Sequence, residues 1–375
     1  MQNYKIAVVA GDGIGPEVIG EARKVLCRAG EKFGFSFEWQ EFPYGAKHYL
    51  ATGETIPEEG FAALEKCDAM LLGAIGDPAV KPGILEHGIL LALRFRYDQY
   101  VNLRPALSFP RVPTPVPLGE KRIDSVVVRE NTEDLYMGIG GIAQNGNLGM
   151  AIDVKRGAYS LTGELNLSTD PAYPLAGQVA INTRPSVERI TRYACRLAEK
   201  RGEKKVTVVS KSNAVSALYG FFEDVAKEVM AKEYPDLTYA MVNVDALCYH
   251  LVRDPAAYGV LLCPNLFGDI ISDLQAGLAG GLGTAAGGNI GDGLSMFEPV
   301  HGSAPDIAGT GKANPVAAIL SGGLLLQHLG EFEAASALDK AVTEFLVNAS
   351  ADALPFEFGG KATFAQVGDA VAKNI

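Results

Sequence analysis

Two aspartates, Asp269 and Asp273, stand four residues apart soon after the apolar run at 260–263. If residues 265–268 form a turn and a helix follows, both carboxylates share one helical face, where like charges repel. Apolar neighbours such as Ile270 indicate a place near the core, where that repulsion is larger. A hard divalent cation, Mg²⁺ or Mn²⁺, would relieve it, because such ions prefer carboxylate oxygens. The pair therefore predicts a metal site, with an exposed acidic face as the alternative.

Three arginines supply the complementary charge. Arg94 falls on a predicted helix, Arg104 lies in an Asn-Leu-Arg-Pro run, and Arg129 ends a predicted strand. An arginine at the end of a buried apolar strand destabilises the fold unless a carboxylate or phosphate pairs with it. A guanidinium fork binds a carboxylate through two hydrogen bonds. Together the three predict a pocket for a dicarboxylate, although each alone would more often be a structural ion pair.

Tyr136 and Lys211 are candidate proton carriers. Lys211 directly follows a predicted strand at 206–209, and α/β proteins place their sites at the carboxyl ends of strands. A single Lys or Tyr is normally solvated or packed. Only the neighbouring motifs favour a role in proton transfer for these two residues.

Two irregular segments could hold a ligand. Residues 11–16 read Gly-Asp-Gly-Ile-Gly-Pro between a strand and a helix, but their spacing is not that of the dinucleotide fingerprint, so a tight turn without a ligand is favoured. Residues 298–306 and 312–315 combine prolines, glycines and His301. A rigid loop of this kind is a good ligand holder, and a plain surface loop is the alternative.

The elements that must position these residues alternate along the chain. Apolar runs of strand length at 5–10, 69–73, 125–128, 206–209 and 260–263 are separated by amphipathic stretches at 17–28, 187–200 and 217–231. This alternation predicts an α/β fold with a mostly parallel, buried sheet. Residues 138–181 are rich in Gly, Asn, Ser, Thr and Pro, which favours an extended β-arm. An arm with little core of its own predicts a dimer clasp.

Composition excludes some classes of function. The formal net charge of −11 disfavours nucleic-acid and anionic-membrane binders, which need a surplus of Lys and Arg. The N-terminus enters an apolar strand directly, and we find neither a signal peptide nor a run long enough to span a bilayer. Five scattered cysteines indicate buried, reduced thiols and a cytoplasmic protein.

Taken together, the motifs resemble the β-decarboxylating dehydrogenases of the isocitrate/isopropylmalate family. The resemblance covers essentially the whole chain through residues 11–16, 102–105, 129–133, 211–213, 265–273 and 301–306, in that order. It implies the isopropylmalate dehydrogenase-like fold, with a large cofactor-binding domain at 1–99 and 255–375. The small dimerisation domain would be 100–254, with its β-arm at about 138–182.

The same resemblance implies roles for individual residues. It makes Asp245, Asp269 and Asp273 the ligands of Mg²⁺ or Mn²⁺, with Asp245 from the partner subunit of a homodimer. Arg94, Arg104 and Arg129 would bind the malate moiety, Lys211 of the partner would accept the hydroxyl proton, and Tyr136 would be the later acid. The cofactor would be NAD, since the carboxylate of Asp306 would repel the 2′-phosphate of NADP. The other cofactor contacts would be Ile14, His301, Gly302, Ser303, Ala304, Pro305 and Asn314.

The helix before Arg94 is where the family reads the C3 substituent of its substrate. Isocitrate enzymes place Ser and Asn where this chain has Gly88 and Leu90, and homoisocitrate enzymes place Arg at Leu91. An extra carboxylate would face Ile89, Leu90 and Leu91 unpaired. A small or apolar substituent is therefore favoured.

Within the family, residues 98–105 look like the tartrate/D-malate branch, and His87 replaces the Glu of the isopropylmalate pattern. We therefore predict NAD-dependent oxidative decarboxylation of a D-malate- or tartrate-like 2-hydroxy acid. The alternative is 3-isopropylmalate. Isocitrate, homoisocitrate and a non-catalytic regulatory subunit are less favoured, the last because every implied catalytic residue is present.

Overall fold

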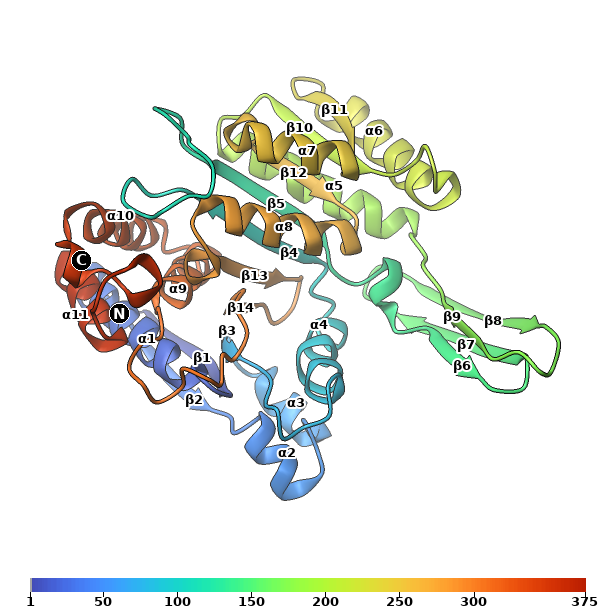
Figure 1. The fold of residues 1–375 in the computed structure, drawn as a ribbon, viewed down its shortest axis with the longest axis horizontal. Helices are drawn as coiled ribbons and strands as arrows, with labels where there is room; N and C mark the ends of the chain where they lie inside the picture. The colour runs from blue at the N-terminus through green and yellow to red at the C-terminus, as the bar shows by residue number, and fades with distance from the viewer. Residues whose placement is uncertain (1) are drawn as a thin grey trace.

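The computed structural model describes residues 2–375, which are built around a ten-stranded sheet (Figure 1). In spatial order its strands are β11 (Thr238–Asn243), β10 (Lys205–Ser210), β12 (Val260–Cys263), β5 (Asp124–Glu130), β4 (Val101–Leu107), β13 (Ala286–Ile290), β14 (Met296–Pro299), β3 (Ala69–Ala74), β1 (Gln2–Gly11) and β2 (Phe35–Glu41). Neighbours run parallel except at the β4–β5, β4–β13 and β13–β14 pairs. All five runs expected to be strands are strands, and the α/β fold with a mostly parallel sheet is confirmed.

Helices cover both faces of the sheet. They are α1 (Gly15–Phe33), α2 (Ala46–Thr52), α3 (Glu58–Leu64), α4 (Ala92–Arg96), α5 (Arg184–Lys200), α6 (Phe221–Glu233), α7 (Val244–Arg253), α8 (Asn265–Ala279), α9 (Val316–His328), α10 (Phe332–Asn348) and α11 (Phe364–Asn374). A π-helical turn, Glu86–Leu91, runs into α4. The residues expected to form a turn at 265–268 are instead the first turn of α8, where the Leu266 amide donates to the Asp134 carboxylate.

Strand alternation decides which side chains reach the α8 side of the sheet. Val126 and Val128 pack in the core shared with α5 and α6, whereas Val127 packs in the core shared with α7 and α8. Since side chains two residues apart share a face, Arg129 lies on the α8 side. On β4, Leu103 packs in the core with α5 and α6, and Ala106 packs in the core with α7 and α8. Arg104 shares the face of Ala106 and therefore also faces α8.

Two further cores lie at the other end of the sheet. One joins β1, β3 and β14 to α1, α9, α10 and α11, and the other joins the opposite face of these strands to α2, α3 and α4. The second core contains Ile89, which is fully buried. Ile89 therefore does not face a substrate, contrary to the expectation. The division into domains at 99/100 and 254/255 stays a prediction; β12 and α8 share their core with β5.

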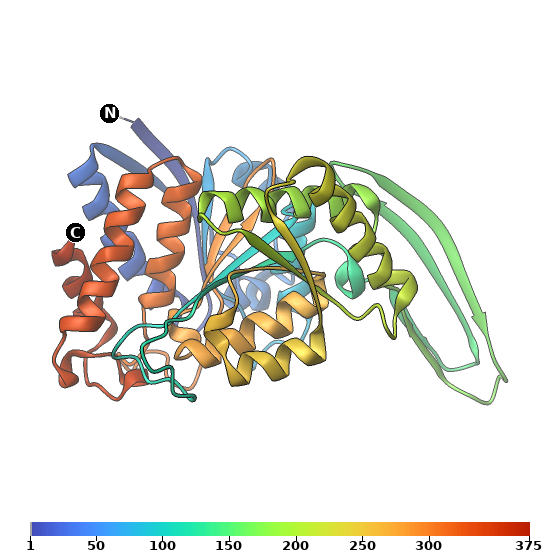
Figure 2. The ribbon, with the colours of Figure 1, turned by 90° about the horizontal axis from the view of Figure 1, so that it is seen from above.

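The segment expected to be an arm forms two small antiparallel sheets. They pair β6 (Gly140–Ala143) with β9 (Leu175–Gln178) and β7 (Asn147–Lys155) with β8 (Ser160–Ser168). In both views the arm extends away from the rest of the molecule (Figure 1, Figure 2). Its core is small, and Ile142 and Leu167 are exposed.

The five cysteines differ in burial. Cys67, Cys195 and Cys263 are buried, but Cys27 is exposed and Cys248 half-buried, so burial holds for three of the five. All five are free. Within residues 2–375, no helix has the length and apolar character needed to cross a membrane.

Asp339 on α10 gives the fold a testable pH dependence. Burial raises the pKa of its carboxyl from 3.8 to about 6, so ionising it costs the folded state free energy that the unfolded chain does not pay. The contribution of this carboxyl to the free energy of unfolding is therefore most favourable below about pH 4. It is lost as the pH rises through about 6. We expect Asp339→Asn to be more stable than the wild type by about 2–3 kcal/mol at pH 8.

Thermal unfolding of both proteins at several pH values measures this difference. The gain should shrink towards zero near pH 4, where the wild-type carboxyl is protonated. A difference independent of pH would contradict the assignment to Asp339.

Candidate active site

The three arginines, which come from three different elements, converge on one region. Arg104 on β4 lies 3.3 Å from Asp269 and 3.4 Å from Asp273, measured from Nη1 to Oδ1. Arg129 on β5 is fully buried and pairs with the same Asp269 oxygen. Burial lowers the pKa of Arg129 to about 9, with the charge of Arg104 acting in the same direction. A cluster of this kind attracts anions strongly.

Arg94 joins the cluster from α4. Its Nη2 lies 3.2 Å from Oε1 of Glu298 on β14, and Nδ2 of Asn289 on β13 donates to the same carboxylate oxygen at 2.7 Å. Asn289 in turn accepts hydrogen bonds from Asn102 and Asn131. Asn289 is thus part of a buried network that fixes Arg94.

Tyr136 lies in a 3₁₀ turn, Asp134–Met137, and its side chain contacts Asp269. Its hydroxyl donates to Oδ2 of Asp269 at 2.5 Å, and Arg129 lies 5.0 Å from its ring centroid. Burial and the bond to Asp269 raise the pKa of Tyr136. The chain therefore brings Tyr136, Asp269 and the arginines into one cluster.

Asp134, which the sequence did not single out, holds this turn to α8. It is buried with φ at +62°, and its carboxylate accepts hydrogen bonds from the Leu266 amide at 3.0 Å and the Tyr219 hydroxyl at 3.3 Å. The Leu266 amide is one of the free donors at the start of a helix. Asp134 therefore fixes Tyr136 relative to Asp269.

We expect Asp134→Ala to destabilise the protein by about 2–4 kcal/mol, because it removes a helix cap and places at positive φ a residue without the polar side chain that makes this conformation tolerable. Asp134→Asn should lose less, since Asn tolerates this conformation and keeps an acceptor. Chemical denaturation of both variants measures the difference. Equal losses would show that neither the conformation nor the acceptor matters.

Asp269 and Asp273 are the carboxylates available for a metal ion in this chain. The side chain of Asp269 is 34% exposed and that of Asp273 is 59% exposed, and burial and the charge of Asp269 raise the pKa of Asp273. Ile270, expected near the core, is exposed. No cluster of three or more His, Cys, Asp or Glu ligands occurs within the described residues. Two hard oxygen donors fit Mg²⁺ or Mn²⁺, but a further ligand must come from elsewhere.

Lys211 and Asp245 form a separate pair. Lys211 follows β10 and Asp245 begins α7 after β11, and these adjacent parallel strands bring Nζ to 2.5 Å from Oδ1. The Lys211 ammonium lowers the pKa of Asp245. Neither residue pairs with the arginines or with Asp269 in the described part of the chain.

The two ligand-holding segments contact each other. The Ile14 amide donates to the Ser303 carbonyl at 2.9 Å, and a β-carbon at Gly13 would lie 2.0 Å from that oxygen. Glycine at 13 is therefore required for the turn to meet the loop at 301–306. Asp306 is exposed, and Asn314 donates to Glu357 at 2.8 Å. Glu357 was not foreseen, because it comes from a distant helical turn.

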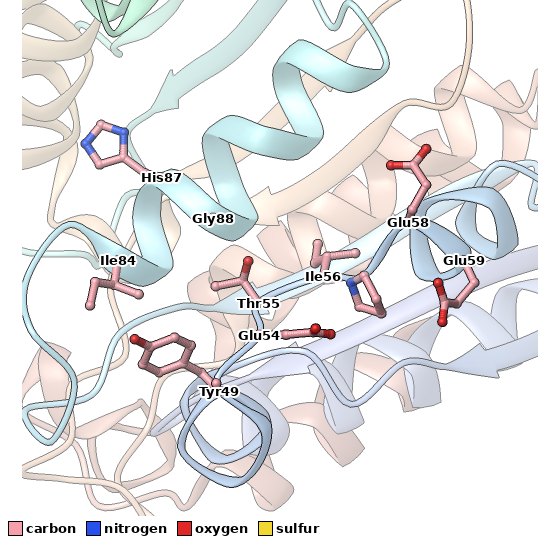
Figure 3. Close-up of a pocket in the computed structure, with 11 residues that line it drawn as sticks. Tyr49, Glu54, Thr55, Ile56, Glu58, Glu59, Ile84, His87 and Gly88 are labelled. Atoms are coloured by element: carbon pink, nitrogen blue, oxygen red, sulfur yellow. The ribbon is translucent and has the colours of Figure 1, made fainter. Parts of the chain in front are cut away.

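The helix before Arg94 presents residues of different burial. His87 is exposed, Leu90 half-buried and Leu91 buried. His87 and Gly88 also line a 740 Å³ cavity facing Thr55 (Figure 3). A β-carbon at Gly88 would lie 2.5 Å from the Thr55 side chain, so glycine there lets the helix pack closely.

The fold and this cluster define a decarboxylating dehydrogenase. The chain belongs to the isocitrate/isopropylmalate dehydrogenase family, whose model matches residues 5–371. It is 43% identical over its full length to the 3-isopropylmalate dehydrogenase of Thermobifida fusca, covering 98% of that protein. With the enzyme of the same name from Nocardia farcinica it shares 46% identity, over 95% of this chain and 98% of the other.

Two solved structures share the fold. Isocitrate dehydrogenase from Methylococcus capsulatus has a TM-score of 0.82 and 34% identity, covering 99% of both chains. The TT0538 protein from Thermus thermophilus has a TM-score of 0.81 and 33% identity, covering 99% of this chain and 68% of its own. The family predicted from the ordered motifs is confirmed, and the two 3-isopropylmalate dehydrogenases fall in the branch predicted as the alternative to tartrate and D-malate.

Proposed function

We propose that this chain catalyses NAD-dependent oxidative decarboxylation of 3-isopropylmalate or a 2-hydroxy dicarboxylate with a similar apolar C3 group. The proposal depends on the three arginines that lie near Asp269 and Asp273. The arginines would bind a dicarboxylate, and the aspartates would bind a metal ion. The names of the relatives favour the isopropyl substituent over that of tartrate. Leu90 and Leu91 next to the clamp agree with it.

D-malate or tartrate is the second candidate. His87 stands where the isopropylmalate pattern has Glu, and it is exposed beside the helix that carries Arg94. A polar side chain at this position suits a small hydroxylated C3 substituent as well as an apolar side chain would suit an isopropyl group. The choice between the two is a matter of measured selectivity.

The chain's own residues would act in sequence. Arg94, Arg104 and Arg129 would bind and orient the two carboxylates. Lys211 of the partner would take the hydroxyl proton, and Tyr136 would protonate the carbon from which carbon dioxide leaves.

Two bound groups would complete the site. Asp269, Asp273 and the partner's Asp245 would hold Mg²⁺ or Mn²⁺, which supplies charge stabilisation at the hydroxyl and carbonyl oxygen. Residues 301–306 with Ile14 and Asn314 would hold NAD, the hydride acceptor. The exposed carboxylate of Asp306 favours NAD over NADP by repelling a 2′-phosphate.

A homodimer would supply Lys211 and Asp245 to the neighbouring site. Large apolar side chains are exposed on α7 and α8, with Tyr249 58%, Val252 50% and Ile270 53% exposed. Exposed apolar side chains on two neighbouring helices are typical of a protein interface, and the arm offers Leu165 and Leu167 as further contacts. All five cysteines are free thiols, which agrees with a cytoplasmic location.

The proposal is tested by NADH formation with Mn²⁺ across 3-isopropylmalate, D-malate, tartrate and isocitrate, each with NAD and with NADP. We expect the highest kcat/KM with 3-isopropylmalate and NAD. A preference for D-malate or tartrate would establish the second candidate. A preference for isocitrate would overturn the role given to Leu90 and Leu91.

A further inference from the structure

Two adjoining cavities lie on the face of β4 that is opposite to Arg104. Their volumes are 260 and 330 Å³, and they share lining residues on β4, α5 and α9, namely Leu103, Leu197, Lys200, Leu324 and Gln327. We call the larger of the two the back cavity. Its volume falls within the range of small-molecule sites, which begins at about 300 Å³.

Most of the wall of the back cavity is apolar. Leu103 lines it because alternate residues of β4 point away from the arginine cluster. The helix α5 contributes Leu197, and α9 contributes Leu324. Ile290 at the end of β13 and Phe332 at the start of α10 add to the same lining. The main body of a ligand in this cavity must therefore be apolar.

The charged residues that line the back cavity are both cations, Arg196 and Lys200 of α5. They stand four residues apart, so they share a helical face, where like charges repel. Arg192, one turn earlier on α5, pairs with Glu233 at 2.8 Å. Arg196 and Lys200 form no such ion pair within residues 2–375. The cavity therefore carries positive charge that no carboxylate compensates.

Lys200 is held at the cavity by an aromatic ring. Its ammonium lies 4.4 Å from the ring centroid of Phe332, a contact that positions the charge without neutralising it. The guanidinium of Arg196 can bind a carboxylate through two hydrogen bonds. On the α9 side, the amide of Gln327 is a further hydrogen-bond donor at the same cavity. These groups favour an anion as the ligand.

Asp339, the acidic residue among those lining the two cavities, belongs only to the smaller one. The smaller cavity thus combines a carboxylate with Lys200 and with Arg201, which pairs with Asp124 at 2.7 Å. An anion in that cavity would lie near Asp339, whereas in the back cavity it meets cations alone. The back cavity is therefore the place for an anionic ligand.

We propose that the back cavity binds a small monocarboxylic acid, with its carboxylate on Arg196 and Lys200 and its apolar body on the leucines of β4, α5 and α9. The uncompensated cations decide the sign of the ligand, and the apolar wall decides the rest of it. A second carboxylate would have to lie against that wall without a partner. Because the cavity is behind the strand that carries Arg104, the monocarboxylic acid and the hydroxy dicarboxylate can be bound at the same time.

The experiment uses 3-phenylpropanoate as the probe and 3-phenylpropanamide as its neutral counterpart, at about pH 7.5. Binding to the whole protein is measured by saturation-transfer NMR and titration. We expect saturable binding of the acid and at least about tenfold weaker binding of the amide, a difference typical of one charged hydrogen bond. Equal binding of the two, or no binding of the acid, would overturn the proposal whether or not the proposed reaction is correct.

Two variants locate the site. Arg196→Gln changes an exposed side chain and should weaken binding of 3-phenylpropanoate at least about tenfold, with a melting curve to verify that the variant is folded. Lys227→Gln is the matched control, because it removes an exposed cation from the neighbouring helix α6 outside the cavity lining. It should leave binding unchanged. Unchanged binding in Arg196→Gln, or equal weakening in both variants, would place the acid elsewhere and overturn the proposal.

Discussion

Replacing Lys211 by methionine is expected to lower kcat by about 10²–10⁴-fold, because a general base contributes that much to a proton transfer. The fold should survive. The pair that Lys211 makes with Asp245 is on the surface, with Asp245 67% exposed, and such pairs contribute at most about 1 kcal/mol. Steady-state turnover and the melting temperature measure the two quantities separately.

Lys205→Met is the matched control. It removes the same charge from the exposed beginning of the same strand, β10, and should keep normal turnover. Retained activity in Lys211→Met would remove that residue from the reaction.

Replacing Asp269 by asparagine is expected to cause two losses. Fully buried Arg129 would lose its carboxylate partner, which costs about 3–5 kcal/mol of stability. Metal-dependent kcat/KM should also fall by at least about 10³-fold, the size of a loss of several kcal/mol in transition-state stabilisation. Unfolding without metal and kinetics with Mn²⁺ check the two parts.

Asp273→Asn separates these effects. Asp273 is the more exposed of the two, and the ion pair found for it is with Arg104 at 3.4 Å. This variant should lose metal-dependent activity with little loss of stability. Similar stability losses in both variants would contradict the assignment of Asp269 as the partner of the buried arginine.

Mixing the two inactive subunits tests the shared site. In a hybrid dimer of Lys211→Met with Asp269→Asn, one site has both native residues and the other has neither. Random reassociation gives half hybrids, so about a quarter of wild-type activity should return. No recovery in verified hybrids would place Lys211 and Asp269 in the same subunit's site.

Strands β1, β3, β5, β10 and β12 were predictable because they are continuous apolar runs. The edge strands β2 and β11 and the strands β4, β13 and β14 were not predicted. β13 reads Ala-Gly-Gly-Asn-Ile, and its place between β4 and β14 depends on the buried hydrogen bonds of Asn289. A Gly-rich segment held by polar contacts distant in sequence has no periodicity to detect.

The site residues that could be predicted are those whose type alone suggests chemistry. Arg129, Asp269 and Tyr136 lie in contact with one another. Their supports escaped prediction, since Glu298 lies 204 positions from the Arg94 it holds and Asp134 acts through its backbone conformation. One prediction at the π-helical turn was wrong, because Ile89 packs in the core rather than facing the substrate.

The central claim is tested most directly by the stoichiometry of the reaction with 3-isopropylmalate, NAD and Mn²⁺. Released carbon dioxide and NADH are measured together. We predict one carbon dioxide for each NADH, with neither formed when the metal is removed. NADH without carbon dioxide, or no turnover of any 2-hydroxy dicarboxylate by the folded protein, would contradict the account.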